Sequence, residues 1–155
     1  MANEFSTAGI KVYYAVETTA GTRPTTGFSV ISGIKSTPDF NPEPSTLEVT
    51  DLADTEWKRF IPGLKDVGGS LAFTANLTSA FKTAWASLVT ASETARESNK
   101  ATWFEIAIPD FDSFYFAGYP TPLGVKGFNV DEVAEIDAYV TPNQIEGWAS
   151  ASTKS

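Results

Sequence analysis

One long segment, residues 36–66, constrains the possible fold and function more than any other feature of this chain. Its sequence is STPDFNPEPSTLEVTDLADTEWKRFIPGLKD, and it separates two stretches that alternate like β-strands. At about thirty residues it far exceeds the usual connection of about 4–6 residues, and such long loops are usually functional. It also carries apolar residues that a surface loop cannot bury on its own chain, namely Leu47, Val49, Leu52, Trp57, Phe60, Ile61 and Leu64. We therefore expect these side chains to be assembly contacts, buried against another copy of the protein.

The rest of the sequence predicts a mainly β fold with a single helix. Alternation of apolar and polar residues indicates strands over 11–16, 28–35, 67–75, 102–108, 114–118, 123–130 and 133–140. Residues 77–98 predict a helix, because apolar residues recur at three- and four-residue spacing after an N-cap at Asn76 or Thr78. The expected class is α+β: an antiparallel β-sandwich or partial barrel with one flanking helix.

We expect one domain over residues 1–155, because no internal repeat or shift in composition divides the chain. Within it we distinguish a long assembly loop at 36–66, a helix at 77–98, an N-terminal arm at 1–9 and a C-terminal tail at 143–155. No apolar run reaches the roughly 18 residues of a membrane span, and the first residues lack the basic and apolar regions of a secretory signal. The expectation is a protein without membrane association.

The residue types present exclude most catalytic chemistry. There is no cysteine and no histidine, which rules out disulfides, thiolate nucleophiles, His–Cys zinc sites and imidazole acid–base pairs. Carboxylates remain, but no spacing marks two of them as a glycosidase pair. Asp110 and Asp112 lack the glycine and the glutamate of a calcium-binding loop. We therefore predict no enzymatic activity and no cofactor or metal.

Aromatic residues in the second half of the chain leave one ligand-binding alternative open. A platform for sugars could be built from Trp103, Phe111, Phe114, Tyr115, Phe116 and Tyr119. The alternative function is therefore a monomeric β-sandwich carbohydrate-binding or adhesion module. We favour a hairpin that packs these rings in the core; an exposed row of coplanar rings would favour the platform. The turn GTRPTTG, at 21–27, lacks the Gly-Lys-Ser/Thr ending of a phosphate-binding loop.

The charge of the chain argues against binding to nucleic acid. The formal net charge is −8, which disfavours non-specific contacts with phosphates. Glu105, Glu135 and Asp137 fall on the polar side of predicted strands, so they could form one electronegative sheet face. An ordinary solvated face explains the same pattern about as well.

Four segments taken together resemble bacteriophage tail tube (major tail) proteins. They are STAGIKVYYAVETTAGTRPTTGF, TPDFNPEPSTLEVTDLADTEWKRFIPGLKDVGGSLAF, TWFEIAIPDF and EIDAYVTPNQIEGW. The most specific element is the combination of Pro-Glu-Pro, Val-Thr-Asp-Leu and Phe-Ile-Pro-Gly-Leu-Lys-Asp within one loop that precedes a strand.

The resemblance implies a structural subunit of a virion tail, assembled in the bacterial host cytoplasm from homo-hexameric rings stacked into a tube. It implies that each subunit lends about four strands to an inner barrel, while the long loop bridges subunits and rings. Other tail proteins, such as the tape measure, terminator and baseplate or tip proteins, would be partners. DNA would pass through the lumen without specific binding.

Simple geometry is compatible with that implication. About twenty-four strands at ~4.8 Å spacing and roughly 40° tilt give a backbone diameter of about 48 Å, which leaves room for duplex DNA. Six copies would carry a charge of about −48, which repels phosphates. We therefore predict that Glu105, Glu135 and Asp137 face the lumen. Trp57 is the expected anchor of the assembly contacts, because Trp is enriched at interface hot spots.

Overall fold

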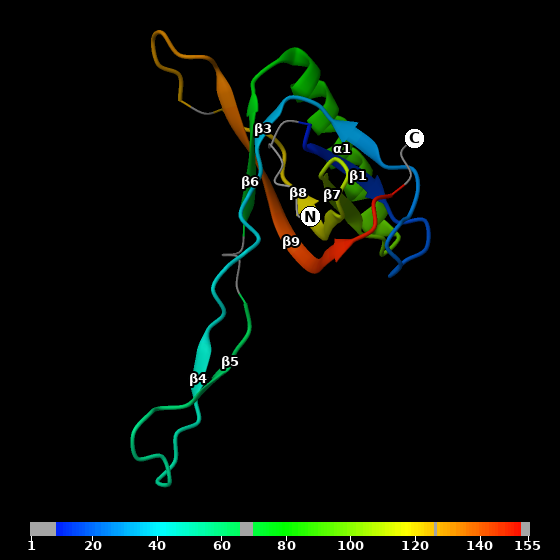
Figure 1. The fold of residues 1–155 in the computed structure, drawn as a ribbon. Coiled ribbons are helices and arrows are strands. Elements are labelled where there is room, and N and C mark those ends of the chain that lie inside the picture. Colours follow the sequence, from blue (N-terminus) through cyan, green and yellow to red (C-terminus); the bar gives the residue numbers. More distant parts are fainter. Residues whose placement is uncertain (1–8, 66–69, 126, 153–155) are drawn as a thin grey trace.

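A seven-stranded sheet organises the part of the chain that the computed structural model describes, residues 9–65, 70–125 and 127–152 (Figure 1). Its strands are β1 (Lys11–Val16), β2 (Ser29–Ile31), β3 (Ile34–Ser36), β6 (Leu71–Asn76), β7 (Thr102–Ala107), β8 (Ser113–Pro120) and β9 (Glu135–Ala149). The order across the sheet is β2-β1-β7-β8-β9-β6-β3, and each neighbouring pair is antiparallel. The mainly β, antiparallel class predicted from the sequence is confirmed.

The sheet curls toward a closed barrel because its two edge strands are consecutive in the chain. β2 and β3 lie at opposite edges of the sheet, yet only Ser32 and Gly33 connect them. Three residue steps span at most roughly 11 Å, so the two edges must lie close together. Gly33 has a φ of 90°, a conformation that glycine adopts without steric cost. The sheet is therefore a partial barrel, as predicted.

Alternation along the strands produces two separate cores. On one face of the sheet, side chains pack with the helix α1 (Ser79–Glu97) in a main core that includes Val12, Phe73, Phe104, Phe116, Ala138, Val140 and the helix residues Phe81, Trp85, Leu88 and Val89. The other face carries a smaller core formed by Ala15, Phe28, Trp103, Tyr115 and Ala117. Both faces of β7 are consequently buried, although the sequence pattern predicted one wet face.

The helix α1 has well-defined ends, and its single tryptophan anchors it to the chain just after β8. Its N-cap is Thr78, whose side chain accepts a hydrogen bond from the Phe81 N–H at 3.1 Å. It ends at Glu97, followed by Asn99 with a φ of 59°. The Trp85 Nε1–H donates to the carbonyl oxygen of Thr121 at 2.8 Å. The predicted range of 77–98 differs from the observed helix by only one or two residues.

The structure corrects two predicted segments of the C-terminal half. Residues 123–130 were expected to form a strand, but their described part lies in a loop that precedes β9. Residues 143–155 were expected to form a tail, but β9 continues through Ala149 and stays paired with β8. The register shifts twice along this pairing, between Tyr115 and Phe116 and between Ala117 and Gly118. Such bulges interrupt the two-residue period, which explains why the sequence pattern did not reveal the strand.

Two other predicted strands differ from the observed ones. The single strand predicted over 28–35 is divided into β2 and β3 by the turn at Gly33. The strand predicted over 67–75 corresponds to β6, while residues 67–69 lie outside the described part of the chain. Residues 1–8 of the expected N-terminal arm also lie outside it.

A buried carboxylate stabilises the junction between the end of β1 and the start of β7. Glu17 is 4% exposed and accepts hydrogen bonds from the Ala101 N–H at 2.8 Å, the Gly21 N–H at 3.0 Å and the Trp103 Nε1–H at 2.8 Å. Burial alone raises the pKa of Glu17, but the hydrogen bonds from Ala101, Trp103 and Gly21 together hold it below its ordinary value.

We expect Glu17→Gln to lower the free energy of unfolding by about 1–3 kcal/mol near pH 7, because a neutral amide cannot accept all three bonds. The folded-state pKa lies below the unfolded one, so this stabilisation is complete above the ordinary value of 4.5 and is lost as pH falls through the folded value. Urea denaturation near pH 7 and near pH 3 should therefore show a smaller difference between the two proteins in acid. An equal difference at both pH values would contradict this account.

Candidate assembly surfaces

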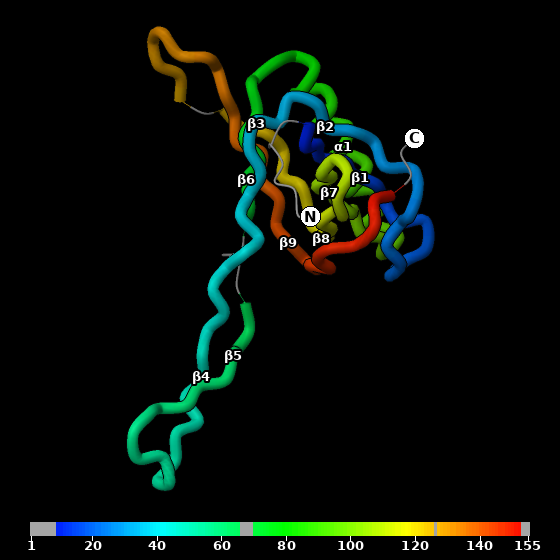
Figure 2. The backbone as a smooth tube through the Cα atoms, viewed as in Figure 1, coloured from blue at the N-terminus to red at the C-terminus, as the bar shows by residue number. Residues whose placement is uncertain are grey.

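The described part of the long segment, residues 36–65, consists of a root around Phe40 that packs on the sheet and an arm that leaves it. In the root, the Phe40 ring lies 5.0 Å from that of Phe114 and 4.6 Å from that of Phe116, measured between centroids. Beyond the root, β4 (Thr46–Glu48) and β5 (Phe60–Pro62) form an antiparallel hairpin. Figures 1 and 2 show this hairpin and its tip projecting far from the body. We call residues 45–64 the arm.

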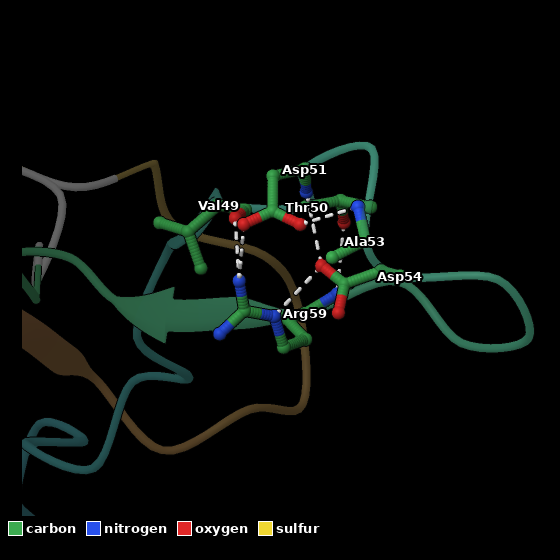
Figure 3. Close-up of polar contacts among 6 residues, drawn as sticks. All are labelled: Val49, Thr50, Asp51, Ala53, Asp54 and Arg59. Carbon is green, nitrogen blue, oxygen red and sulfur yellow. Dashed lines mark hydrogen bonds and ion pairs between the residues drawn. The ribbon is translucent and has the colours of Figure 1, made fainter.

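Polar contacts give the tip of the arm a defined shape (Figure 3). The Arg59 Nε–H donates to Asp54 Oδ2 at 2.8 Å, and its Nη2 lies 3.4 Å from both Asp51 Oδ2 and the Val49 carbonyl oxygen. The Arg59 N–H donates to Thr50 Oγ1 at 2.9 Å. A hydrogen bond from the Asp51 N–H, and then that from Arg59, hold the pKa of Asp54 below its ordinary value. The tip therefore keeps its turn while its apolar side chains stay in solvent.

The apolar side chains of the arm are exposed on both of its faces. Leu47 lies opposite Ile61 on one face, while Phe60 and Pro62 project from the other, because neighbouring residues of a strand alternate. The exposed fractions are 56% for Leu47, 38% for Val49, 102% for Leu52, 81% for Trp57, 54% for Phe60, 47% for Ile61 and 90% for Leu64. An isolated two-stranded hairpin is marginally stable in water. Burial of these side chains would have to come from outside the subunit.

The three acidic residues predicted to line a lumen lie on the same side of the sheet. Glu105 pairs with Tyr115 and Tyr119 pairs with Thr141, which places Glu105 on the side of β9 that carries Glu135 and Asp137. Glu135 and Asp137 are half-buried. Glu135 forms an ion pair with Lys35, and Asp137 accepts a hydrogen bond from Thr74 Oγ1 at 3.0 Å.

Glu105, in contrast, does not lie on an open surface of the subunit. Its side chain is fully buried, and its carboxylate accepts hydrogen bonds from Ser152 Oγ at 2.5 Å and from the Ser152 N–H at 3.3 Å. The Tyr115 hydroxyl donates to Glu105 Oε2 at 3.2 Å, and the guanidinium of Arg23 lies over the Tyr115 ring, 4.0 Å from its centroid. The expectation of a solvated, lumen-facing Glu105 therefore needs correction. Alternation predicted its side of the sheet correctly, but not the C-terminal residues that cover it.

The aromatic residues of the second half do not form a flat exposed platform. Trp103, Tyr115 and Phe116 belong to the two cores. Phe111 and Trp148 are 53% and 57% exposed, but their rings meet edge to face at 89°. Sugar platforms need coplanar rings, so the core-hairpin interpretation is the better supported one. Within the described residues, no cluster of three carboxylates could hold a metal ion, and no helix has the length and apolarity to cross a membrane.

Sequence reasoning missed two further surfaces. The loop of residues 121–134 exposes Val125, Phe128, Val130 and Val133 by 61–86%. Gly127, Asn129 and Asp131 lie between these apolar positions, and such residue types are typical of loops. The second surface is the outer edge of β9 beyond Val140, where no other strand of the described chain pairs with it. A groove of about 680 Å³ lies beside this edge, lined in part by Phe40, Phe114, Ile145 and Trp148.

The chain matches no protein-family model and no curated protein. Among solved structures, it is similar to a chain of the anti-feeding prophage (AFP) baseplate, a cryo-EM structure with 6-fold symmetrisation, at a TM-score of 0.57 and 9% identity. That match covers 95% of this chain and 97% of the other. It is also similar to a chain from the tail of an empty GTA particle, refined with helical and C6 symmetry, at a TM-score of 0.52 and 15% identity, over 90% and 96% of the two chains. The chain therefore has a fold that also occurs in a prophage baseplate and in a particle tail.

Proposed function

We propose that this chain is a structural subunit of a phage-tail tube, which assembles with itself into stacked hexameric rings and catalyses no reaction. The observation that carries the proposal is the arm, whose two faces both expose apolar side chains. Soluble monomers rarely expose large contiguous apolar surfaces unless they bind something. The two similar solved chains come from assemblies with six-fold symmetry, which supports a hexameric ring.

The open edge of β9 supports lateral contacts within such a ring. Beyond Val140 no strand of the described residues pairs with the outer edge of β9, which also carries the exposed side chains of Ile145 and Trp148. An unprotected edge readily pairs with a strand of another chain. Adding a strand from the neighbouring subunit would pair the backbone groups of this edge and cover the two side chains.

The arm is proposed to make the contacts between rings. Permanent assemblies bury more than about 2,000 Å² per interface, and their interfaces are rich in apolar residues. Leu47, Val49, Leu52, Trp57, Phe60, Ile61 and Leu64 provide such a surface, with Trp57 at the tip as its anchor. Other tail proteins would bind the same surfaces at the two ends of the tube. The protein would be located in the virion tail after assembly in the host cytoplasm.

The tube is proposed to conduct DNA without binding it. The net charge of −8 per subunit disfavours phosphate contacts, which would otherwise accumulate along a tube and retain the DNA. We propose that Asp137 and Glu135 face the lumen, with Lys35 offsetting part of the Glu135 charge. Glu105 is omitted from this lumen surface because it is buried within the subunit.

Electron microscopy of the purified protein tests the proposal. We expect rings or tubes with six-fold symmetry, and a reconstruction in which Asp137 points into the channel. Particles of single-subunit size over a wide concentration range would contradict the proposal and favour the monomeric binding module. A channel lined by lysine and arginine would contradict the role as a DNA conduit while leaving the assembly itself intact.

A further inference from the structure

We propose that the loop of residues 121–134 is the surface on which the arm tip of a second copy of this chain docks. This inference rests on the proposed tube function and names the partner surface of the arm. The loop contains four apolar residues that the subunit leaves exposed, Val125, Phe128, Val130 and Val133. The occupant to which we commit is the tip of the arm, residues 49–59.

The positions of the two surfaces fit a contact between successive copies. Figures 1 and 2 show the arm leaving the body in one direction and the loop before β9 projecting in the opposite direction. Repeated head-to-tail contacts require two different, complementary surfaces at opposite ends of each subunit. The arm tip and the loop provide such a pair, because stacking copies in one orientation brings the tip of one toward the loop of the next.

Both surfaces have the chemistry of a hydrophobic contact. The tip presents Leu52 and Trp57, which are 102% and 81% exposed. The loop presents Val125, Phe128 and Val130, all of them largely exposed. Contact between them would remove these side chains from water, and the burial of apolar surface is the main driving force of most protein association.

One charge beside the apolar groups of the tip is opposite in sign to the charges beside those of the loop. At the tip, Arg59 is engaged by Asp51 and Asp54, whereas the adjoining Lys58 forms no ion pair within the described residues. In the loop, Asp131 and Glu132 are exposed between Val130 and Val133, and neither forms an ion pair with the described part of the chain. The tip as a whole is net negative, because Asp51, Asp54 and Glu56 outnumber Lys58 and Arg59, so the match in sign rests on Lys58 alone. An ion pair between Lys58 and the two carboxylates of the loop would favour this partner surface over others and set the position of the tip on it.

A charge-swap experiment tests the contact. We expect Lys58→Glu alone, and Asp131→Lys with Glu132→Lys, each to raise the critical concentration for polymerisation by roughly tenfold, because like charges then face each other. Combining all three substitutions should bring the critical concentration back to within about threefold of the wild-type value, because the attraction is restored with its sign reversed. Lys82→Glu, an exposed lysine on α1, is the matched control and should leave polymerisation unchanged.

The outcomes separate this inference from the function on which it rests. If the reversals leave polymerisation unchanged while Trp57→Ala prevents it, the arm is an assembly contact but the loop is not its partner, and the inference is overturned. Failure of the combined variant to recover, although circular dichroism shows it folded, also overturns it. A wild-type protein that never polymerises overturns both the inference and the proposed function.

Discussion

Replacing Trp57 by alanine is expected to prevent tube formation while leaving the subunit folded. The side chain is 81% exposed at the tip of the arm, so its removal takes almost no packing from its own chain. Exposed substitutions of this kind usually change stability by less than about 0.5 kcal/mol. Truncating a tryptophan at the centre of an interface costs at least about 2 kcal/mol of binding free energy. This loss raises the critical concentration by roughly 30-fold.

Sedimentation and electron microscopy at a series of protein concentrations measure the effect, with thermal unfolding as the test of the fold. Trp57→Phe is the matched control, because it keeps an aromatic ring and should shift the critical concentration much less. If Trp57→Ala forms normal tubes at the wild-type concentration, the arm does not carry the assembly, and the argument from its exposed side chains fails.

The sequence predicted those parts of the fold in which the periodicity is regular. The alternation around Phe104 and Ile106 identified β7 and its hairpin with β8, and the helical spacing of Phe81, Trp85 and Leu88 identified α1. Where bulges interrupt the period, as along Thr141–Ala149, the pattern loses its meaning and a strand was mistaken for a tail. The partial barrel was predicted as a class, but its strand order was not, because the order depends on pairings between segments far apart in the sequence, such as β3 with β6.

The candidate assembly surfaces were also predictable only in part. The arm was evident from composition, because a proline-rich segment with many apolar residues needs no tertiary information to be recognised as unusual. Glu105 shows the limit of this reasoning. Its place in the alternation determines its side of the sheet, but Ser152, which covers its carboxylate, lies 47 residues away in the sequence. The exposed apolar residues of the loop 121–134 were missed because the sequence over 123–130, interrupted by Gly124 and Gly127, resembles a broken strand.

Replacing Trp85 by alanine should produce the opposite result from Trp57→Ala. Its side chain is fully buried, its ring stacks on Phe81 at 5.9 Å, and its Nε1–H donates to the Thr121 carbonyl oxygen at 2.8 Å. The substitution leaves a cavity and an unpaired carbonyl, so we expect the free energy of unfolding to fall by about 3–5 kcal/mol. For a chain of this size, that corresponds to a melting temperature lower by roughly 6–20 °C.

Urea denaturation measures this loss, and Trp85→Phe is the control, because it keeps most of the ring volume and gives up only the hydrogen bond. A loss below about 1 kcal/mol for Trp85→Ala would contradict the packing of α1 against the sheet.

The two tryptophan substitutions also differ in whether a change of temperature can restore assembly. Since Trp85→Ala acts on the folded fraction, lowering the temperature toward the stability maximum should restore tubes. Trp57→Ala removes the contact itself, so no change that merely stabilises the subunit should restore its assembly.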